Sequence, residues 1–391
     1  MAERSAWGAV SVLAVSLVAC RGQDVEDGDA VVPVVIPDGC APLEAAEGSL
    51  VRASPGDDLP SLLADATPGT TVLLADGTYD LSGGDAVGTL RWSADHVRLR
   101  GESGDPSRVV LDARADTDTL VSILGDGALV ADLTLTRSFG SGVDIRGAQG
   151  TTLYRVILED AGEHAILAAP ADGRGADGGV ARCIVERRVG GCGTGVALRQ
   201  TDGWTIAESE FDHGSCDQPA IRAWSGARGT RVERNVIRAR DVAMRIGDVS
   251  YDEGEERVYP DAACDGGMIG HYGGIVRDNL VVGALRVENV CGTRLSHNTV
   301  WNGTLSWSFA DGLALVNNLA DTQDGGGAAR NDGGRAPQAS DFVDPDGGDL
   351  HLAAGAAARG AGVALEAGFD DVDVDGDPRD RAAPAVGADE P

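Results

Sequence analysis

A six-residue frame recurs along the middle of this chain. In four copies its fourth position is asparagine, and the frame reads Val-Glu-Arg-Asn-Val-Ile in one copy and Leu-Val-Asn-Asn-Leu-Ala in another. Successive copies are mostly 19 to 27 residues apart. A repeat of this length indicates stacked units, because one unit cannot bury its apolar face without neighbours. The residues at the fourth position are Leu133, Val156, Cys183, Ser209, Asn235, Asn279, Asn298 and Asn318.

Between consecutive copies lies a segment in which apolar and other residues alternate, as in a half-buried strand. Residues 195–199 and 284–288 are two examples. Each repeat would then hold three short strands and no long helix. We therefore predict an all-β fold, a right-handed, single-stranded parallel β-helix of about nine to eleven coils over residues 51–330. The asparagines should stack in one column and hydrogen-bond along its axis.

With these repeats, the chain resembles the pectate-lyase-like superfamily and its NosD-like, right-handed β-helix relatives over roughly residues 51–330. The resemblance implies a substrate cleft on the outward face of the first strand of each coil. The family's catalytic motifs are mostly missing. Arg245-Ile-Gly and Asp212-His-Gly are only fragments of the polygalacturonase-type series, and the chain has no lysine for a Lys and Arg pair. Arg245 or Arg222 could imitate the arginine base that pectate lyases use with calcium.

The regions outside the repeats suggest export. Residues 1–19 resemble a bacterial lipoprotein signal peptide, and Cys20 would be the lipidated first residue of the mature chain. An ordinary secretory signal with an incidental cysteine is the alternative. Residues 20–50 should form an acidic tether, 57–66 a short helix that caps the first coil, and 331–391 an acidic tail that packs on the last coils. We expect a monomer at the outer membrane or cell surface, held by lipid only.

Charge narrows the choice of partner. The formal net charge is −30 and the isoelectric point is near 4.4. Nucleic-acid binding needs a basic face, so this class of partner is disfavoured.

The chain has seven cysteines, and lipidation of Cys20 would leave six in an oxidising compartment. The alignment of the coils predicts two disulfides, Cys192–Cys216 and Cys264–Cys291, because their turns should be stacked. Cys183 falls at the asparagine position and is expected to point inward. It would either pair with Cys40 or remain a buried thiol.

The outward column of the first strands is rich in arginine. Period-two alternation places Arg146, Arg199, Arg222, Arg245 and Arg286 on this face, with Trp224 and Glu288. Guanidinium groups bind carboxylates or sulfates through paired hydrogen bonds, and an exposed indole stacks on sugar rings. The alternative is that these arginines pair with neighbouring carboxylates across stacked coils.

An insertion at residues 248–274 should form one wall of the cleft, because long loops with their own aromatic residues are usually functional or disordered. The candidate catalytic residues are Arg245, Arg222, His213 and Asp212. The candidate substrate-binding residues are Arg146, Arg199, Trp224, Arg286, Glu288, Tyr251, His271 and Tyr272.

Asp371, Asp373 and Asp375 match the first half of a calcium-binding loop, but the twelfth position is Ala382 where a glutamate is required. The sequence leaves two interpretations open, a calcium site or a hydrogen-bonded aspartate turn. No other cofactor is indicated.

Together these features predict a protein that binds a polysaccharide, anionic if the arginines are exposed. It would cleave a uronic glycan by β-elimination or would act without catalysis as a surface, adhesion or structural module. The chemistry rests on geometry rather than on a motif.

Overall fold

The computed structural model describes residues 36–37, 39–46, 48–188, 192–249, 257–259, 264, 268–324, 329–365 and 371–390. Cys20, the signal-like segment and Tyr251 lie outside the described residues. The chain divides into two units, and all described residues belong to the unit Pro33–Pro391. None of the helices in the described part is long and apolar enough to cross a membrane.

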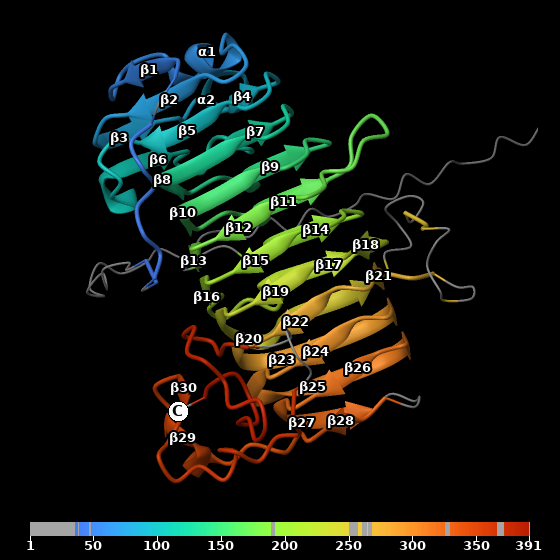
Figure 1. The fold of residues 1–391 in the computed structure, drawn as a ribbon. Coiled ribbons are helices and arrows are strands. Elements are labelled where there is room, and N and C mark those ends of the chain that lie inside the picture. Colours follow the sequence, from blue (N-terminus) through green and yellow to red (C-terminus); the bar gives the residue numbers. More distant parts are fainter. Residues whose placement is uncertain are drawn as a thin grey trace, which may run out of the picture. The chain divides into compact units, whose positions relative to one another are not determined.

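Parallel strands stacked coil upon coil make up most of this unit (Figure 1). They form three faces, because each coil contributes a strand to each face in turn. The first face contains β4 (Leu90–Trp92), β7 (Val121–Ile123), β9 (Ser141–Arg146), β11 (His164–Ala169), β14 (Thr194–Arg199), β17 (Ile221–Trp224) and the later parts of β20 (Val236–Asp248), β23 (Leu280–Cys291), β25 (Thr299–Asp311) and β27 (Leu319–Asp324).

The second face is the most continuous. It contains β1 (Leu50–Ala53), β2 (Thr71–Leu74), β5 (Arg98–Gly101), the starts of β8 (Leu129–Thr136) and β10 (Thr152–Glu159), β12 (Val180–Arg182), β15 (Thr205–Ala207), β19 (Arg231–Glu233), β22 (Ile275–Arg277), β24 (Arg294–Ser296), β26 (Ala314–Val316) and β28 (Asn331–Asp332).

The third face contains β3 (Gly77–Asp80), β6 (Val109–Asp112), the ends of β8 and β10, β13 (Val185–Arg187), β16 (Glu210–Asp212) and the starts of β20, β23, β25 and β27. Two further short strands, β18 (Ala227–Arg228) and β21 (His271–Tyr272), lie in the turn after the first face. The remaining elements are α1 (Leu59–Ala64), α2 (Asp85–Gly88), the 3-10 turns η1 (Pro106–Arg108) and η2 (Ala339–Asp341), and the antiparallel pair β29 (Phe342–Asp344) and β30 (Asp349–Leu352).

Alternation of side chains fills the interior, as the sequence predicts. Val143, Val196, Ile221, Met244 and Leu285 occupy the inward positions of successive first-face strands, and each is fully buried. The same holds for their partners two residues later, Ile145, Leu198, Ala223, Ile246 and Val287. The core is therefore a long aliphatic column between the three faces.

The predicted asparagine ladder is present. The Asn235 side-chain amide donates to the side-chain oxygen of Asn279 at 2.9 Å, Asn279 donates to Asn298 at 2.9 Å, and Asn298 donates to Asn318 at 2.9 Å. Asn331 in β28 extends the ladder by one coil, since Asn318 donates to its side-chain oxygen at 3.1 Å. All four predicted members are fully buried, so the amides satisfy turn groups that water cannot reach.

The turn between the second and third faces uses one left-handed residue in most coils, with φ between 50° and 58°. We call this line of residues the corner. The next residue in the chain points inward and is the ladder residue. The corner consists of Asp132, Arg155, Cys183, Glu208, Arg234, Asp278, His297 and Asn317.

This geometry corrects the predicted register at one coil. Val185 pairs with Glu210 and Arg182 with Ala207, which aligns Cys183 with the corner residue Glu208 and Ile184 with Ser209. Ile184 is therefore the inward residue, and Cys183 lies one position before it, at the corner. The predicted register is off by one residue here because the upstream coils contain no asparagine that could fix it.

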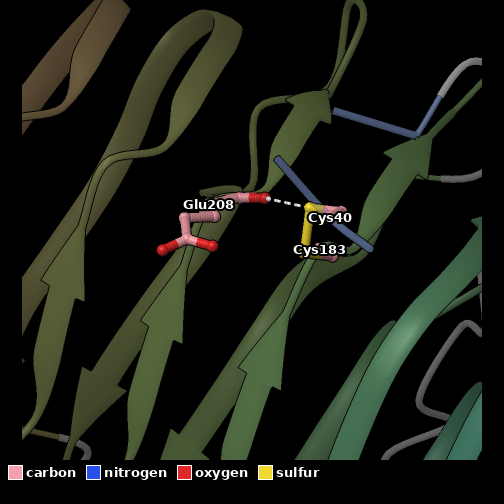
Figure 2. Close-up of side chains that lie close together, drawn as sticks. All are labelled: Cys40, Cys183 and Glu208. Atoms are coloured by element: carbon pink, nitrogen blue, oxygen red, sulfur yellow. Dashed lines mark hydrogen bonds between the residues drawn. A yellow bond between two sulfur atoms is a disulfide. The ribbon is translucent and has the colours of Figure 1, made fainter. Parts of the chain in front are cut away.

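Residues 36–37 and 39–46, here called the strap, run along the outside of this corner. Cys183 forms a disulfide with Cys40 of the strap, one of the two alternatives left open for it, and Glu208 lies beside the bond (Figure 2). Arg155 donates to the carbonyl of Cys40, and Tyr154 donates to the carbonyl of Ala41 at 2.7 Å. This part of the segment interpreted as a tether is thus fixed to the β-helix.

Both ends of the stack carry additional structure. The short helix α1 begins after Asp58, whose carboxylate accepts from the Ser61 amide at 3.2 Å, and it buries Leu59 and Leu63 against the first coils. The tail (residues 333–365 and 371–390) packs on the third face of the last coils, where Phe342 meets Trp301 edge-on at 5.3 Å between ring centroids.

Candidate functional site

Three arginines occupy one column on the first face. Arg222 of β17 pairs in register with Arg245 of β20, and Arg245 pairs with Arg286 of β23. The three residues therefore come from three consecutive coils, and their backbones lie about 4.8 Å apart along the stack. The sequence predicts this arrangement because inward Met244 and Ile246 leave Arg245 on the outer surface.

Carboxylates compensate these cations. Asp248 accepts from Arg222 at 2.6 Å and from Arg245 at 3.3 Å, so the two arginines share one partner. Glu288 lies 3.9 Å from Arg245. Asp241 accepts from Arg286 at 3.5 Å and is itself 60% exposed. The column thus has local carboxylate partners, as the alternative interpretation predicts, but two of its contacts are long and solvent-accessible.

The prediction that the indole of Trp224 is exposed is wrong. The residue is 3% exposed, and the Arg222 guanidinium covers its ring at 4.5 Å from the centroid. The guanidinium makes a cation–π contact with the face of the ring, so no indole surface is left for a sugar.

The other two arginines of the predicted column lie on earlier coils. Arg199 pairs in register with Trp224, one coil from Arg222. Arg146 is further along the stack and donates to Asp144 at 2.6 Å. Leu167 and Ala197 fill the column between Asp144 and Arg222, so the arginines form two groups rather than one continuous strip.

His213 and Asp212 belong to a different part of the molecule. Asp212 ends β16 on the third face and is exposed. His213 is fully buried, with Nδ1 3.2 Å from Glu186, which also accepts from Arg188 at 2.6 Å. A buried cluster of three charged or polar groups explains the position of His213, and its side chain has no surface from which to contact a glycan.

His164 at the start of β11 is a group that the predicted site does not include. Burial, followed by the positive charges of Arg188, Arg222 and Arg146, lowers its pKa to about 4. The imidazole is therefore neutral near pH 7. The effect of Arg222 and Arg146 on this pKa places His164 in the field of both arginine groups.

The described residues of the insertion, among them 257–259, 264 and 268–274, pack beside the turn after the first face. His271 and Tyr272 form β21, and both are buried. Burial lowers the pKa of His271 to about 4. Tyr259 packs edge-on against Tyr272 at 5.1 Å, and Arg257 binds Asp177 at 2.7 Å. His271 and Tyr272 thus anchor the insertion instead of lining a cleft.

One of the two predicted disulfides forms. Cys264 is bonded to Cys291 and fastens the insertion to β23. Cys192 and Cys216 are adjacent as predicted, with their sulfur atoms 2.7 Å apart, a separation longer than the S–S bond of Cys264 and Cys291. Burial raises the pKa of Cys216 to about 12.

The three aspartates of the predicted calcium loop have separate partners. Asp373 is buried and accepts from the amides of Asp375, Asp377 and Glu390 at 2.8 to 3.0 Å, which is the hydrogen-bonded aspartate turn. Asp371 pairs with Arg381 at 3.1 Å, and Asp375 lies 3.3 Å from His351. Among the described residues, these three carboxylates do not form a common ligand cluster.

Comparison with known proteins identifies the fold. The structure is similar to pectate lyase Pel9A, with a TM-score of 0.59, 13% identity, and coverage of 89% of this chain and 97% of that one. It is also similar to a rhamnogalacturonan lyase, with a TM-score of 0.50, 12% identity, and coverage of 78% and 95%. The protein is a right-handed parallel β-helix. No family model matches its sequence, and no curated protein does.

Proposed function

We propose that this β-helix binds an acidic polysaccharide along its first face, at Arg222, Arg245 and Arg286. The observation that carries the proposal is the register of these three arginines on consecutive coils. A repeating ligand needs a repeating receptor, and a solenoid supplies one through its constant rise per coil. The names of the two similar structures, a pectate lyase and a rhamnogalacturonan lyase, support a glycan as the ligand.

The carboxylates on this face do not prevent such binding. Arg245 and Arg286 are 31% and 35% exposed, and their contacts to Glu288 and Asp241 are 3.9 and 3.5 Å long. Ion pairs of this kind contribute only about 0–1 kcal/mol, so a uronate carboxylate can replace Glu288 or Asp241 at little cost. Two parallel hydrogen bonds from a guanidinium would favour the incoming carboxylate by geometry as well as charge.

Cleavage by β-elimination is a second candidate function. Arg245 lies between Asp248 and Glu288, so one position on the face offers a cation for the uronate carboxylate and carboxylates that could hold calcium. An elimination also needs a group that removes the proton next to the uronate carboxyl group. Arg245 and Arg222 remain the candidates for this step, although a guanidinium is a very weak acid.

Location is part of the same proposal. A lipid on Cys20 would anchor the exported chain at the outer membrane or cell surface as a monomer, and the later part of the predicted tether would form the strap. A glycan-binding face on such a protein serves either degradation or adhesion, and the non-catalytic surface module is the alternative to a lyase.

The test is a screen of the purified protein against polygalacturonate, alginate and a neutral glucan, with and without calcium. Retention by the two acidic polymers, weakened by salt, and no retention by the neutral one would support the proposed face. Absorbance of the unsaturated product would distinguish a lyase from a binding module. Equal affinity for all three polymers, or for none, would refute the proposal.

A further inference from the structure

The corner of the β-helix is covered from both ends. The strap covers it around Asp132, Arg155 and Cys183, and the tail covers it around Asp278, His297 and Asn317. Between them, around Glu208 and Arg234, a cavity of about 580 Å³ remains. The strap, the second and third faces and the tail all contribute to its lining, so three segments that are distant in sequence meet at one site.

His351 of β30 lies on the tail side of this cavity together with Asp375. Its Nδ1 is 2.6 Å from Asp349, and its Nε2 is 3.3 Å from Asp375. One potential ligand atom each from His351, Asp375 and Asp389 lies within 4.8 Å of the other two. A carboxylate on one imidazole nitrogen, with the other nitrogen directed at a carboxylate cluster, is the usual environment of a metal-binding histidine.

The separation of His351 and Asp375 suits a small divalent ion. Bonds of about 2.0–2.2 Å to nitrogen and oxygen in tetrahedral geometry place neighbouring ligand atoms roughly 3.3 Å apart, which the separation of His351 and Asp375 already matches. Asp389 is 5% exposed, and one of its oxygens accepts from the Leu352 amide at 2.6 Å. That bond holds the carboxylate in place.

Charge points the same way. Asp349, Asp375 and Asp389 surround a single imidazole. Three carboxylates against one imidazole give the cluster an excess of negative charge that a divalent cation would balance.

We propose that His351, Asp375 and Asp389 bind a divalent metal ion of the zinc class, with Asp349 orienting the imidazole. An imidazole ligand favours zinc or a similar transition metal over calcium, which prefers a shell of oxygen atoms. Three protein ligands leave a coordination position open toward the cavity, where water can complete the shell. This site is distinct from the arginine face and does not depend on the proposed glycan binding.

The experiment uses the purified protein without a histidine tag. A chelator first removes bound metal, and the protein is then titrated with Zn²⁺ in a calorimeter. We expect one ion per chain. His351→Gln should weaken binding at least tenfold, and Asp349→Asn about tenfold to a hundredfold, the range for orienting partners. His96→Gln is the matched control, because His96 is exposed and lies outside the cavity. It should leave the affinity unchanged.

Two further measurements keep the test decisive. Asp375→Asn changes an exposed turn residue. It therefore tests the carboxylate ligands even if a change at buried Asp389 disturbs folding. It should also weaken Zn²⁺ at least tenfold. Co²⁺ in place of Zn²⁺ should give a visible absorption band that His351→Gln removes. The proposal is overturned if Zn²⁺ binds equally to wild type and His351→Gln, if it does not bind, or if only Ca²⁺ binds.

Discussion

The corner and the first face use the same chemistry in opposite ways. Both align arginines with carboxylates across stacked coils. Where the tail covers the corner the pair is desolvated, since Arg379 of the tail and Asp278 have no exposed side-chain surface and lie 2.8 Å apart. On the first face the corresponding side chains remain open, with Arg286 35% and Asp241 60% exposed. Among the described residues, a strap and a tail cover the corner, whereas no comparable segment covers Arg286.

Burial decides what each pair can do. Removing one member of a buried pair leaves a charge without water or partner and costs about 3–5 kcal/mol. An exposed pair contributes at most about 1 kcal/mol, so its members are free to exchange partners. The comparison therefore predicts that corner variants lose stability, whereas first-face variants lose binding.

The largest effect is expected for Arg379→Met. Arg379 donates to Asp278 and to the carbonyls of Gly387 and Ala388, so its loss should lower the free energy of unfolding by about 3–5 kcal/mol. Denaturant unfolding followed by circular dichroism measures this. Arg381→Met is the matched control, because Arg381 pairs with Asp371 at the surface. Equal effects of the two changes would contradict the comparison.

The strap should contribute through its disulfide. Cys40 and Cys183 are 143 residues apart, and Cys264 and Cys291 are 27 apart. In the chain-entropy model the longer loop makes the Cys40–Cys183 bond worth about 1.5 kcal/mol more than the Cys264–Cys291 bond. Unfolding of the Cys40→Ser/Cys183→Ser and Cys264→Ser/Cys291→Ser proteins tests this. A larger loss from the second pair would show that the strap adds little.

Acid should lower the free energy of unfolding, because two buried histidines are neutral in the folded protein. Burial lowers the pKa of His271 to about 4 and that of His297 to about 3, whereas an unfolded histidine titrates near 6.5. Between these values the unfolded chain binds more protons than the folded one. Stability is therefore present above about pH 6.5 and falls as the pH decreases, by up to about 1.4 kcal/mol per pH unit for each histidine.

Unfolding midpoints measured from pH 7 to pH 4.5 check this dependence. His297→Gln should make the slope shallower, because one of the groups that take up a proton on unfolding is lost. A slope that His297→Gln leaves unchanged would show that this histidine is not protected in the folded protein.

The sequence predicts the features that repeat from coil to coil. The inward residues, the asparagine ladder and the register of Arg222, Arg245 and Arg286 follow from period-two alternation and from a frame whose asparagine has one suitable position. The frame fails at Cys183 because an aliphatic residue, Ile184, holds the inward position there and fixes no register. Alternation therefore defines which side of a strand a residue takes, but not what later covers that side.

Contacts between distant segments are beyond such patterns. The covering of Trp224 by Arg222, the burial of His213 beside Glu186, and the meeting of His351 with Asp389 depend on side-chain packing or on where the tail lies. The sequence correctly leaves pairing of the arginines with carboxylates as an alternative, because Asp241, Asp248 and Glu288 are near neighbours in the chain or on adjacent coils.

The smallest stability effect is expected on the first face itself. Arg286→Ala removes an exposed pair with Asp241, so the free energy of unfolding should fall by less than about 1 kcal/mol. The same denaturant measurement applies. A loss comparable to that of Arg379→Met would mean that the first-face arginines are structural.

Affinity of folded Arg245→Ala for an acidic glycan tests the central claim most directly. A charged hydrogen bond is worth about 1.5–3 kcal/mol, so we expect at least about tenfold weaker binding to polygalacturonate or alginate, whichever the wild type binds. Added salt should weaken the wild type more than the variant. Arg52→Ala, which removes an exposed pair with Glu102 on another face, should bind as the wild type does. Unchanged affinity of Arg245→Ala would contradict the account.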